Sequence, residues 1–196
     1  HTRVLSDPDY RKKLDDKIEE LRQYLTKDRI AGLLDTYKPV VKKYLFSMPD
    51  IAYAEITEDR YDDLLNAILD EIDINYELYK ESLEKPMPFY INAPVVEGDR
   101  IKYAWDAAFD FDGEDIKYEV QIARDLDFTD IIASYDNITI PIVYTEKLPI
   151  GQYFIRVKAI NASGKEQYAQ DYYLTEDKKH YGIRVFYVQP DGTIGT

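Results

Sequence analysis

The chain has 196 residues, a formal net charge of −13 and no cysteine. Its acidity argues against nucleic acid and anionic membrane surfaces as partners, because both attract cationic patches. The lack of cysteine excludes disulfides, thiolate metal sites and a cysteine nucleophile.

The glycine distribution divides the chain in two. The first 85 residues contain only Gly32, and the other seven glycines follow it. We therefore predict an α+β protein with two segregated parts: a helical segment over 1–88 and an antiparallel β-sandwich over 89–196 with a C-terminal extension. No apolar run has the length of a membrane span, so we expect no membrane insertion. The chain begins with His1 rather than Met, which suggests a piece of a longer polypeptide.

Three helices are predicted in the first part. Asp7 can cap the first, Pro8 suits its opening turn, and apolar residues at helical spacing extend it over 8–27. The second begins after Asp28, and Pro39 is expected to kink or divide it near Lys38. The third runs from Thr57 to about Glu84.

The apolar stripes of these helices are broad, so we expect them to pack against a larger partner. Two prolines then stop helix formation, and 85–90 is predicted to be an extended linker.

Four short segments of the helical part carry a family resemblance. They are 7–11 (Asp-Pro-Asp-Tyr-Arg), 26–30 (Thr-Lys-Asp-Arg-Ile), 47–50 (Ser-Met-Pro-Asp) and 75–83 (Asn-Tyr-Glu-Leu-Tyr-Lys-Glu-Ser-Leu). Together they resemble the C-terminal helices of the CotH family, which is named for spore coat protein H. The members are atypical, secreted or surface-associated protein kinases, and some bacterial members carry additional β-sandwich domains.

The resemblance implies that residues 1–88 end a kinase domain whose nucleotide site lies upstream. ATP and a divalent metal would bind there, because this chain has no phosphate-binding glycine loop and no kinase catalytic sequence. No cofactor is therefore expected in this chain. The resemblance also implies a spore-coat, cell-surface or secreted location and partners among proteins or surface components.

The second part, over 93–174, alternates short apolar strands with turns. Trp105 lies on an early strand, and Tyr118 begins the next. Phe128 and its neighbours cover an end of the sandwich or begin another short strand. The isoleucines of 138–142 predict a fifth strand, at an edge because it contains Pro141. A charged break at 175–179 precedes a further alternating stretch, which adds an edge strand or begins another module.

The stretch 148–164 is the most informative of the β part. Tyr153 begins an alternating strand, and a Pro-Ile-Gly turn separates it from Leu148. This spacing predicts a tyrosine corner, in which the hydroxyl bonds to the backbone between about 144 and 148. The stretch resembles the sixth strand of a fibronectin type III domain, with Trp105 and Tyr118 as its core companions.

Few residues suggest chemistry. Asp110, Asp112 and Asp115 surround a glycine and are a weak candidate for a cation loop; a solvated turn is the favoured interpretation. His1 and His180 are the only imidazoles, and they are too far apart in sequence to argue for a metal site or a catalytic triad. We predict no catalytic residue in this chain.

Nineteen tyrosines are the unusual feature of the composition. Most are interpreted as packing residues with a solvated hydroxyl. The alternatives are an aromatic contact surface for a protein partner or a glycan, or cross-linking in a coat. The C-terminal tyrosines are the place to look for such a surface: Tyr168, Tyr172, Tyr173, Tyr181 and Tyr187.

Two functions follow. The first is the non-catalytic C-terminal portion of a CotH-like kinase with a fibronectin type III-like interaction module. The second is a stand-alone, non-enzymatic extracellular or spore-coat interaction module.

Overall fold

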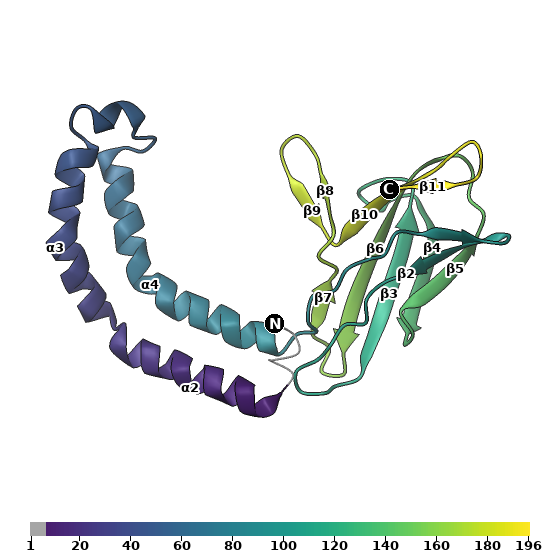
Figure 1. Cartoon of the computed structure of the whole chain (residues 1–196), viewed down its shortest axis with the longest axis horizontal. Helices are drawn as coiled ribbons and strands as arrows, with labels where there is room; N and C mark the ends of the chain where they lie inside the picture. Colours follow the sequence, from purple (N-terminus) through teal and green to yellow (C-terminus); the bar gives the residue numbers. More distant parts are fainter. Residues whose placement is uncertain (1–6) are drawn as a thin grey trace. The chain divides into compact units, whose positions relative to one another are not determined.

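The computed structural model of the protein describes residues 7–196, which form two compact units (Figure 1). The first unit is helical and ends at Lys80; the second is a set of strands that runs to Thr196. The predicted fold class, a helical segment followed by an antiparallel β-sandwich, is confirmed. The units divide eight residues before the predicted boundary at 88. His1 lies outside the described residues.

The predicted helices form with caps at their first turns. Asp7 accepts a hydrogen bond from the Asp9 N–H at 2.9 Å, and Pro8 occupies the first turn. The hydroxyls of Thr26 and Thr57 accept backbone N–H groups at the starts of the next two helices. The elements are α2 (Pro8–Tyr24), α3 (Lys27–Leu45), the 3-10 helix η1 (Asp50–Tyr53) and α4 (Glu58–Leu83).

Pro39 does not divide α3, so the predicted break near Lys38 is wrong. A proline inside a helix has no N–H to donate to the carbonyl four residues earlier, here Asp35. Asp35 is exposed, so solvent can satisfy that carbonyl. The helix therefore continues to Leu45.

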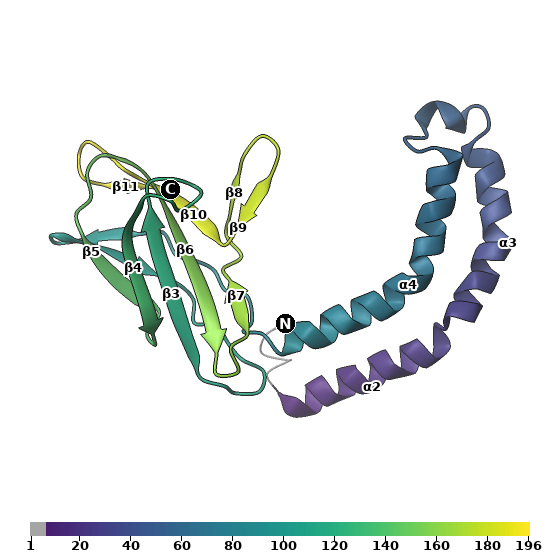
Figure 2. The ribbon, with the colours of Figure 1, turned by 180° about the vertical axis from the view of Figure 1, so that it is seen from behind.

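Polar contacts pair α2 and α3 with α4, which runs in the opposite direction (Figures 1 and 2). Tyr79 donates to the Asp15 carboxylate at 2.7 Å, and Lys42 donates to Asp62 at 2.9 Å. Burial and the bond to Asp15 raise the pKa of Tyr79. No side chain of residues 7–80 is buried. None of the helices in the described residues is long and apolar enough to span a membrane.

The second unit contains two antiparallel sheets and a hairpin. The smaller sheet has the order β1-β2-β5, and the larger has the order β11-β10-β6-β3-β4 with β7 also paired to β6. This two-sheet arrangement is that of a fibronectin type III-like sandwich. The strands are β1 (Val95–Glu97), β2 (Arg100–Ala104), β3 (Ile116–Ala123), β4 (Ile131–Ile138), β5 (Ile142–Glu146), β6 (Gly151–Asn161), β7 (Glu166–Tyr168), β8 (Tyr172–Leu174), β9 (Lys179–Tyr181), β10 (Ile183–Val188) and β11 (Ile194–Gly195).

The predicted strand over 138–142 is wrong. Ile138 ends β4 in the larger sheet, whereas Ile142 begins β5 in the smaller one. The chain crosses between the sheets at Ile140 and Pro141, and the Pro141 carbonyl accepts the Trp105 N–H at 3.2 Å. Ile138 packs on the core, whereas Ile140 is 66% exposed, so the regular apolar spacing across this corner does not mark one buried face.

The alternating stretch after the charged break is β10, a strand of the main sheet. It pairs with β6 from Ile183 to Val188, and only the two-residue β11 lies outside it. The alternative of a new module is therefore wrong, and the alternative of a strand added to an edge agrees with the structure, because only β11 borders β10 on its outer side. The charged residues at 175–179 suggested that the sandwich ends before them. They instead form the turn of the hairpin β8–β9, and the sandwich continues after them.

The core between the sheets contains the predicted aromatic residues. The rings of Trp105 and Tyr118 meet edge to face with centroids 5.3 Å apart, and the Tyr118 hydroxyl accepts the Ala108 N–H at 2.8 Å. Leu148 is half-buried against the same cluster. The fully buried side chains of this core include Ile91, Ile101, Tyr103, Val120, Ile122, Ile155, Val157 and Phe186.

Tyr153 forms the corner of the sandwich. Its ring is 2% exposed and stacks on Phe186, with centroids 5.5 Å apart. Its hydroxyl donates to the Pro149 carbonyl at 2.9 Å, one residue beyond the expected loop segment. The bond ties the start of β6 to the turn before it.

The opposite face of β6 is also covered. Phe154 is 5% exposed in a second buried cluster with Phe128 and Ile183. Tyr173 of the hairpin meets the Phe154 ring edge to face at 5.3 Å. Loop 125–129 and the hairpin therefore bury the second face of β6 at Phe154.

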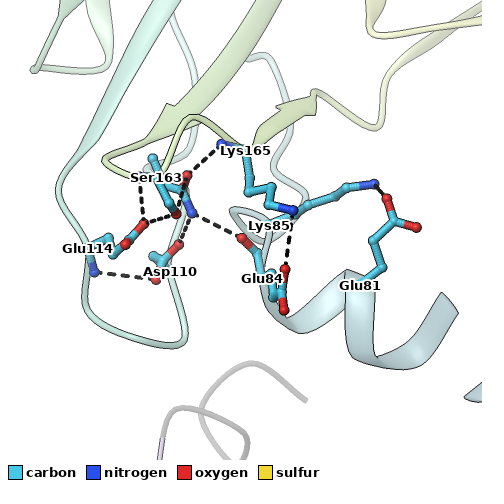
Figure 3. Close-up of polar contacts among 8 residues, drawn as sticks. Glu81, Glu84, Lys85, Asp110, Glu114, Ser163 and Lys165 are labelled. Carbon is cyan, nitrogen blue, oxygen red and sulfur yellow. Dashed lines mark hydrogen bonds and ion pairs between the residues drawn. The ribbon is translucent and has the colours of Figure 1, made fainter. Parts of the chain in front are cut away.

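The segment 84–90 is part of the sandwich, so the prediction of a linker is wrong. Pro86 is fully buried, and the Met87 N–H donates to the Phe109 carbonyl at 2.7 Å. The Asn161 amide donates to the Glu84 carbonyl at 3.0 Å and to Asp110 at 2.9 Å (Figure 3). Prolines stop the helix here, but hydrogen bonds to the strands fix the segment that follows.

We expect Tyr153→Phe to lower the free energy of unfolding by about 0.5–1.5 kcal/mol, because it removes only the bond to Pro149. Phe154→Ala should cost about 3–5 kcal/mol, because it leaves a cavity in the second cluster. Urea titrations measure both values, and Tyr187→Phe at an exposed position is the control. A Tyr153→Phe variant as stable as the wild type would contradict the role of the hydroxyl.

The fragment 81–196 should unfold at a higher urea concentration than 90–196. The shorter fragment loses buried Pro86 and the core residue Phe89 and leaves the Phe109 carbonyl unpaired, which should cost at least about 3 kcal/mol. Circular dichroism during urea titration measures the two midpoints. Equal midpoints would mean that residues 81–89 are a linker after all.

Candidate functional site: a tyrosine groove at a divided strand

The final long strand of the sandwich is divided into two pieces by an insertion. β7 and β10 both pair with β6 on the same side. Ala169 donates its N–H to Val157, whereas Ile183 pairs with the neighbouring Arg156. The 13 residues 170–182 are therefore looped out between adjacent positions of β6, and they contain the hairpin β8–β9 (Figures 1 and 2).

Asp171 anchors the base of this insertion. Its carboxylate accepts the Ile91 N–H at 2.7 Å and pairs with Arg184 at 3.1 Å. Arg184 also donates to the Ile91 carbonyl at 2.9 Å, and the Gly182 N–H donates to the Asp171 carbonyl at 2.7 Å. Asp171 is 10% exposed, so little solvent competes for these bonds. The two ends of the insertion are therefore held against the sandwich.

Gly182 is required where the insertion rejoins the sheet. Its φ is +80°, and a Cβ there would lie 2.9 Å from the Cβ of Tyr168. Both the backbone conformation and the space exclude a larger residue. The close approach places Tyr168 directly beside the base of the hairpin.

An open groove of about 600 Å³ lies along this junction. One wall is β7 with the two residues that follow it, and the other consists of residues before β1 and the first and last residues of the hairpin. The lining residues are Lys85, Tyr90, Glu166, Gln167, Tyr168, Ala169, Gln170, Tyr172 and Tyr181.

Four tyrosines dominate the groove. Their exposed fractions are 54% for Tyr90, 41% for Tyr168, 50% for Tyr172 and 64% for Tyr181. Tyr172 and Tyr181 face each other across the hairpin, with ring centroids 5.7 Å apart. Within the described residues no hydrogen bond involves any of these four hydroxyls. The rings therefore offer apolar faces and free hydroxyls to a ligand.

The charged side chains at the groove are paired with neighbours. Lys85 lies 2.6 Å from Glu81 and holds the pKa of that carboxyl below its usual range. Glu166 lies 2.8 Å from Lys158, which also pairs with Glu119. The hydrogen bonds with these two carboxylates raise the pKa of Lys158. The groove is therefore close to electrically neutral.

The three aspartates of the weak cation candidate do not form such a site. Asp110 is 4% exposed, and its Oδ1 accepts the N–H of Glu114 (Figure 3) and the N–H of Asp112. Its Oδ2 accepts from the Asn161 amide. Asp112 and Asp115 are exposed. In residues 7–196 no group of three or more His, Asp or Glu side chains could hold a metal ion. Asp110 instead closes a turn, but it is buried, so the favoured interpretation of a solvated turn fits Asp112 and Asp115 and not Asp110.

The structure separates the five C-terminal tyrosines singled out in the sequence. Tyr168, Tyr172 and Tyr181 line the groove, Tyr173 packs on Phe154, and Tyr187 lies within 3.4 Å of Gln152 outside the groove. Sequence reasoning missed Tyr90, Lys85, Gln167 and Gln170. The available signal for Tyr90 was its place directly after apolar Phe89, a pattern typical of strand-like packing with one side chain buried and the next exposed.

Comparisons with known proteins give limited matches. No family model and no curated protein matches the chain. A solved Fn3-like protein from Clostridium thermocellum is similar, with a TM-score of 0.32 and 23% identity over 42% of this chain and 82% of its own. The twitchin kinase region from C. elegans has a TM-score of 0.32 and 17% identity over 48% of this chain and 19% of its own. The chain thus spans less than a fifth of the twitchin region.

Gly182→Ala should destabilise the sandwich and distort the groove. Gly164→Ala is the matched control, because Gly164 also has a φ of +80° but has no atom within 4 Å of the added Cβ. In the control, backbone strain alone should lower the free energy of unfolding by about 1–2 kcal/mol. Gly182→Ala should lower it by at least about 1 kcal/mol more, because of the contact with Tyr168. Urea titration measures the difference. Equal losses would show that the contact with Tyr168 is unimportant.

Proposed function

We propose that the protein is a non-catalytic interaction module whose binding surface is the tyrosine groove. The observation that carries this proposal is the set of four half-exposed tyrosines at the anchored base of the hairpin. Tyrosine supplies a large amphipathic contact area at a low cost in side-chain entropy. An anchored base limits the entropy lost when a ligand binds. The expected partners are proteins or components of a cell or spore surface.

The exposed apolar residues of the helical unit support the proposal that this chain is part of a larger protein. Each helix turns one side toward its neighbour, and each also carries a stripe of exposed apolar side chains. At 100° per residue, this stripe lies about a third of a turn around the helix from the side that faces the neighbour, in the same rotational direction on all three helices. Because α4 runs antiparallel to α2 and α3, the same direction of rotation places all three stripes on one face of the unit. The side chains of this face include Leu14, Leu21, Leu33, Tyr37, Val40, Tyr44, Leu64, Ile68 and Leu78, all at least 37% exposed.

An exposed apolar face of this size is typical of an interface. Together with the resemblance of residues 1–88 to the CotH family, it supports the proposal that this unit ends a CotH-like kinase domain and packs on its upstream part. The parent would be secreted, on the cell surface or in a spore coat, and would bind ATP and a divalent metal outside this chain. The absence of a matching family model weighs against this finer proposal.

The alternative is a stand-alone interaction module. The reading frame upstream of His1 distinguishes the two. Several hundred further residues with a nucleotide site support the kinase parent, whereas a nearby start codon supports the stand-alone module.

Binding to isolated cell-wall and spore-coat preparations tests the proposed function. The chain should cosediment with at least one preparation, and Tyr172→Ala and Tyr181→Ala should each reduce the bound fraction at least about fivefold, the loss of roughly 1 kcal/mol of ring contact. Tyr187→Ala, which alters an exposed tyrosine outside the groove, should bind as the wild type does. Binding that is equal in all variants would exclude the groove as the binding surface.

The isolated fragment 7–80 should melt broadly, because none of its side chains is buried. Differential scanning calorimetry measures the width of the transition, and light scattering measures the mass. The fragment 81–196 is the control and should melt cooperatively. A sharply melting, monomeric 7–80 fragment would contradict the proposal that this unit needs an upstream partner.

A further inference from the structure

We infer that the ligand of the tyrosine groove is a neutral oligosaccharide. This inference rests on the proposed binding role of the groove and adds the chemical class of the ligand. Three properties of the groove lead to it: its charge balance, its exposed ring faces and its mixture of free hydrogen-bond donors and acceptors.

The charge balance excludes a strongly charged ligand. Lys85 and Glu166 are the charged residues that line the groove, and each has a partner outside it, Glu81 and Lys158 respectively. The Lys179 ammonium lies over the Tyr172 ring, 4.8 Å from its centroid, so a ligand with a phosphate or carboxylate would have to draw this lysine away from the ring, and the chain as a whole carries −13. A cationic ligand would have to compete with Lys158 for Glu166. The groove therefore suits an uncharged molecule.

The rings supply flat apolar surfaces that remain accessible. Tyr172 and Tyr181 lie side by side at the base of the hairpin, and Tyr90 and Tyr168 line the same groove. Each of these tyrosines is between 41% and 64% exposed, and Lys179 lies over the ring of Tyr172, so a ligand that packs on that face displaces the lysine. A pyranose ring presents a face of C–H groups that can pack on such a surface, and its hydroxyls then lie at the edge. Several rings along an open groove suit a chain of sugar units rather than one enclosed unit.

The polar groups distinguish a sugar from the main alternative, a proline-rich peptide. Such peptides also dock on aromatic grooves, but a polyproline backbone offers carbonyl acceptors and few donors. The Gln170 side chain is exposed and has no hydrogen-bond partner within the described residues, and its amide both donates and accepts. Glu166 can only accept. Sugar hydroxyls donate and accept, so they match both functions of the Gln170 amide, whereas a polyproline ligand has no donor for the Gln170 amide oxygen.

Isothermal titration of the full chain tests the inference with three probes: cellohexaose, chitohexaose and a decaproline peptide. We expect at least one of the two hexasaccharides to bind. Tyr168→Ala and Tyr172→Ala should each weaken that binding at least about tenfold, and Gln170→Ala should weaken it severalfold. Tyr172→Phe should retain most of the affinity, which separates ring stacking from the hydroxyl. Tyr187→Ala is the matched control and should bind as the wild type does.

Thermal melts of every variant, followed by circular dichroism, show whether a variant that no longer binds is still folded. The inference is overturned if neither hexasaccharide binds with a Kd below about 10 mM, if decaproline binds in their place, or if the groove variants bind the sugars as the wild type does. Failure of the sugars while cosedimentation still depends on Tyr172 would overturn the ligand class but leave the groove as the binding surface. If neither sugar binding nor cosedimentation depends on the groove tyrosines, the proposed function is overturned as well.

Discussion

The pairing of β6 is the constraint on which the second unit depends. β6 is bonded to β3 along one side and to β7 and then β10 along the other, so its backbone groups are satisfied on both sides. One of its faces packs into the sandwich through Tyr153, and the other packs on the second cluster through Phe154. A strand held in this way can tolerate an interruption in one neighbour, because the rest of the ladder keeps its register.

That interruption explains how the groove arises. The insertion of 13 residues is looped out of the sheet between two adjacent β6 partners, and the groove lies between β7 and the base of the hairpin. Asp171 and Arg184 secure the base through Ile91, a residue from before the first strand. The groove is therefore assembled from three separate parts of the chain on a rigid scaffold, which is the usual setting of a binding loop.

The two units are stabilised by different interactions. In the helical unit, capping, propensity and surface ion pairs hold elements that bury no side chain in residues 7–80. Exposed ion pairs contribute little, and isolated helices are marginal in water. In the second unit, burial on two faces of one sheet supplies the stability.

The sequence by itself determined the local structure of this protein. The helix starts at Asp7 and Thr57 and the alternation around Tyr153 were predicted because these signals act over a few residues, whereas the cap at Thr26 lies within the span predicted for the first helix. Only the tertiary structure decided how distant segments combine. It turned the predicted linker at 85–90 into a wall of the groove, the charged break at 175–179 into a hairpin turn, and the tail into the neighbour of β6. These outcomes depend on pairing between residues far apart in sequence, and composition and periodicity carry no record of such pairing.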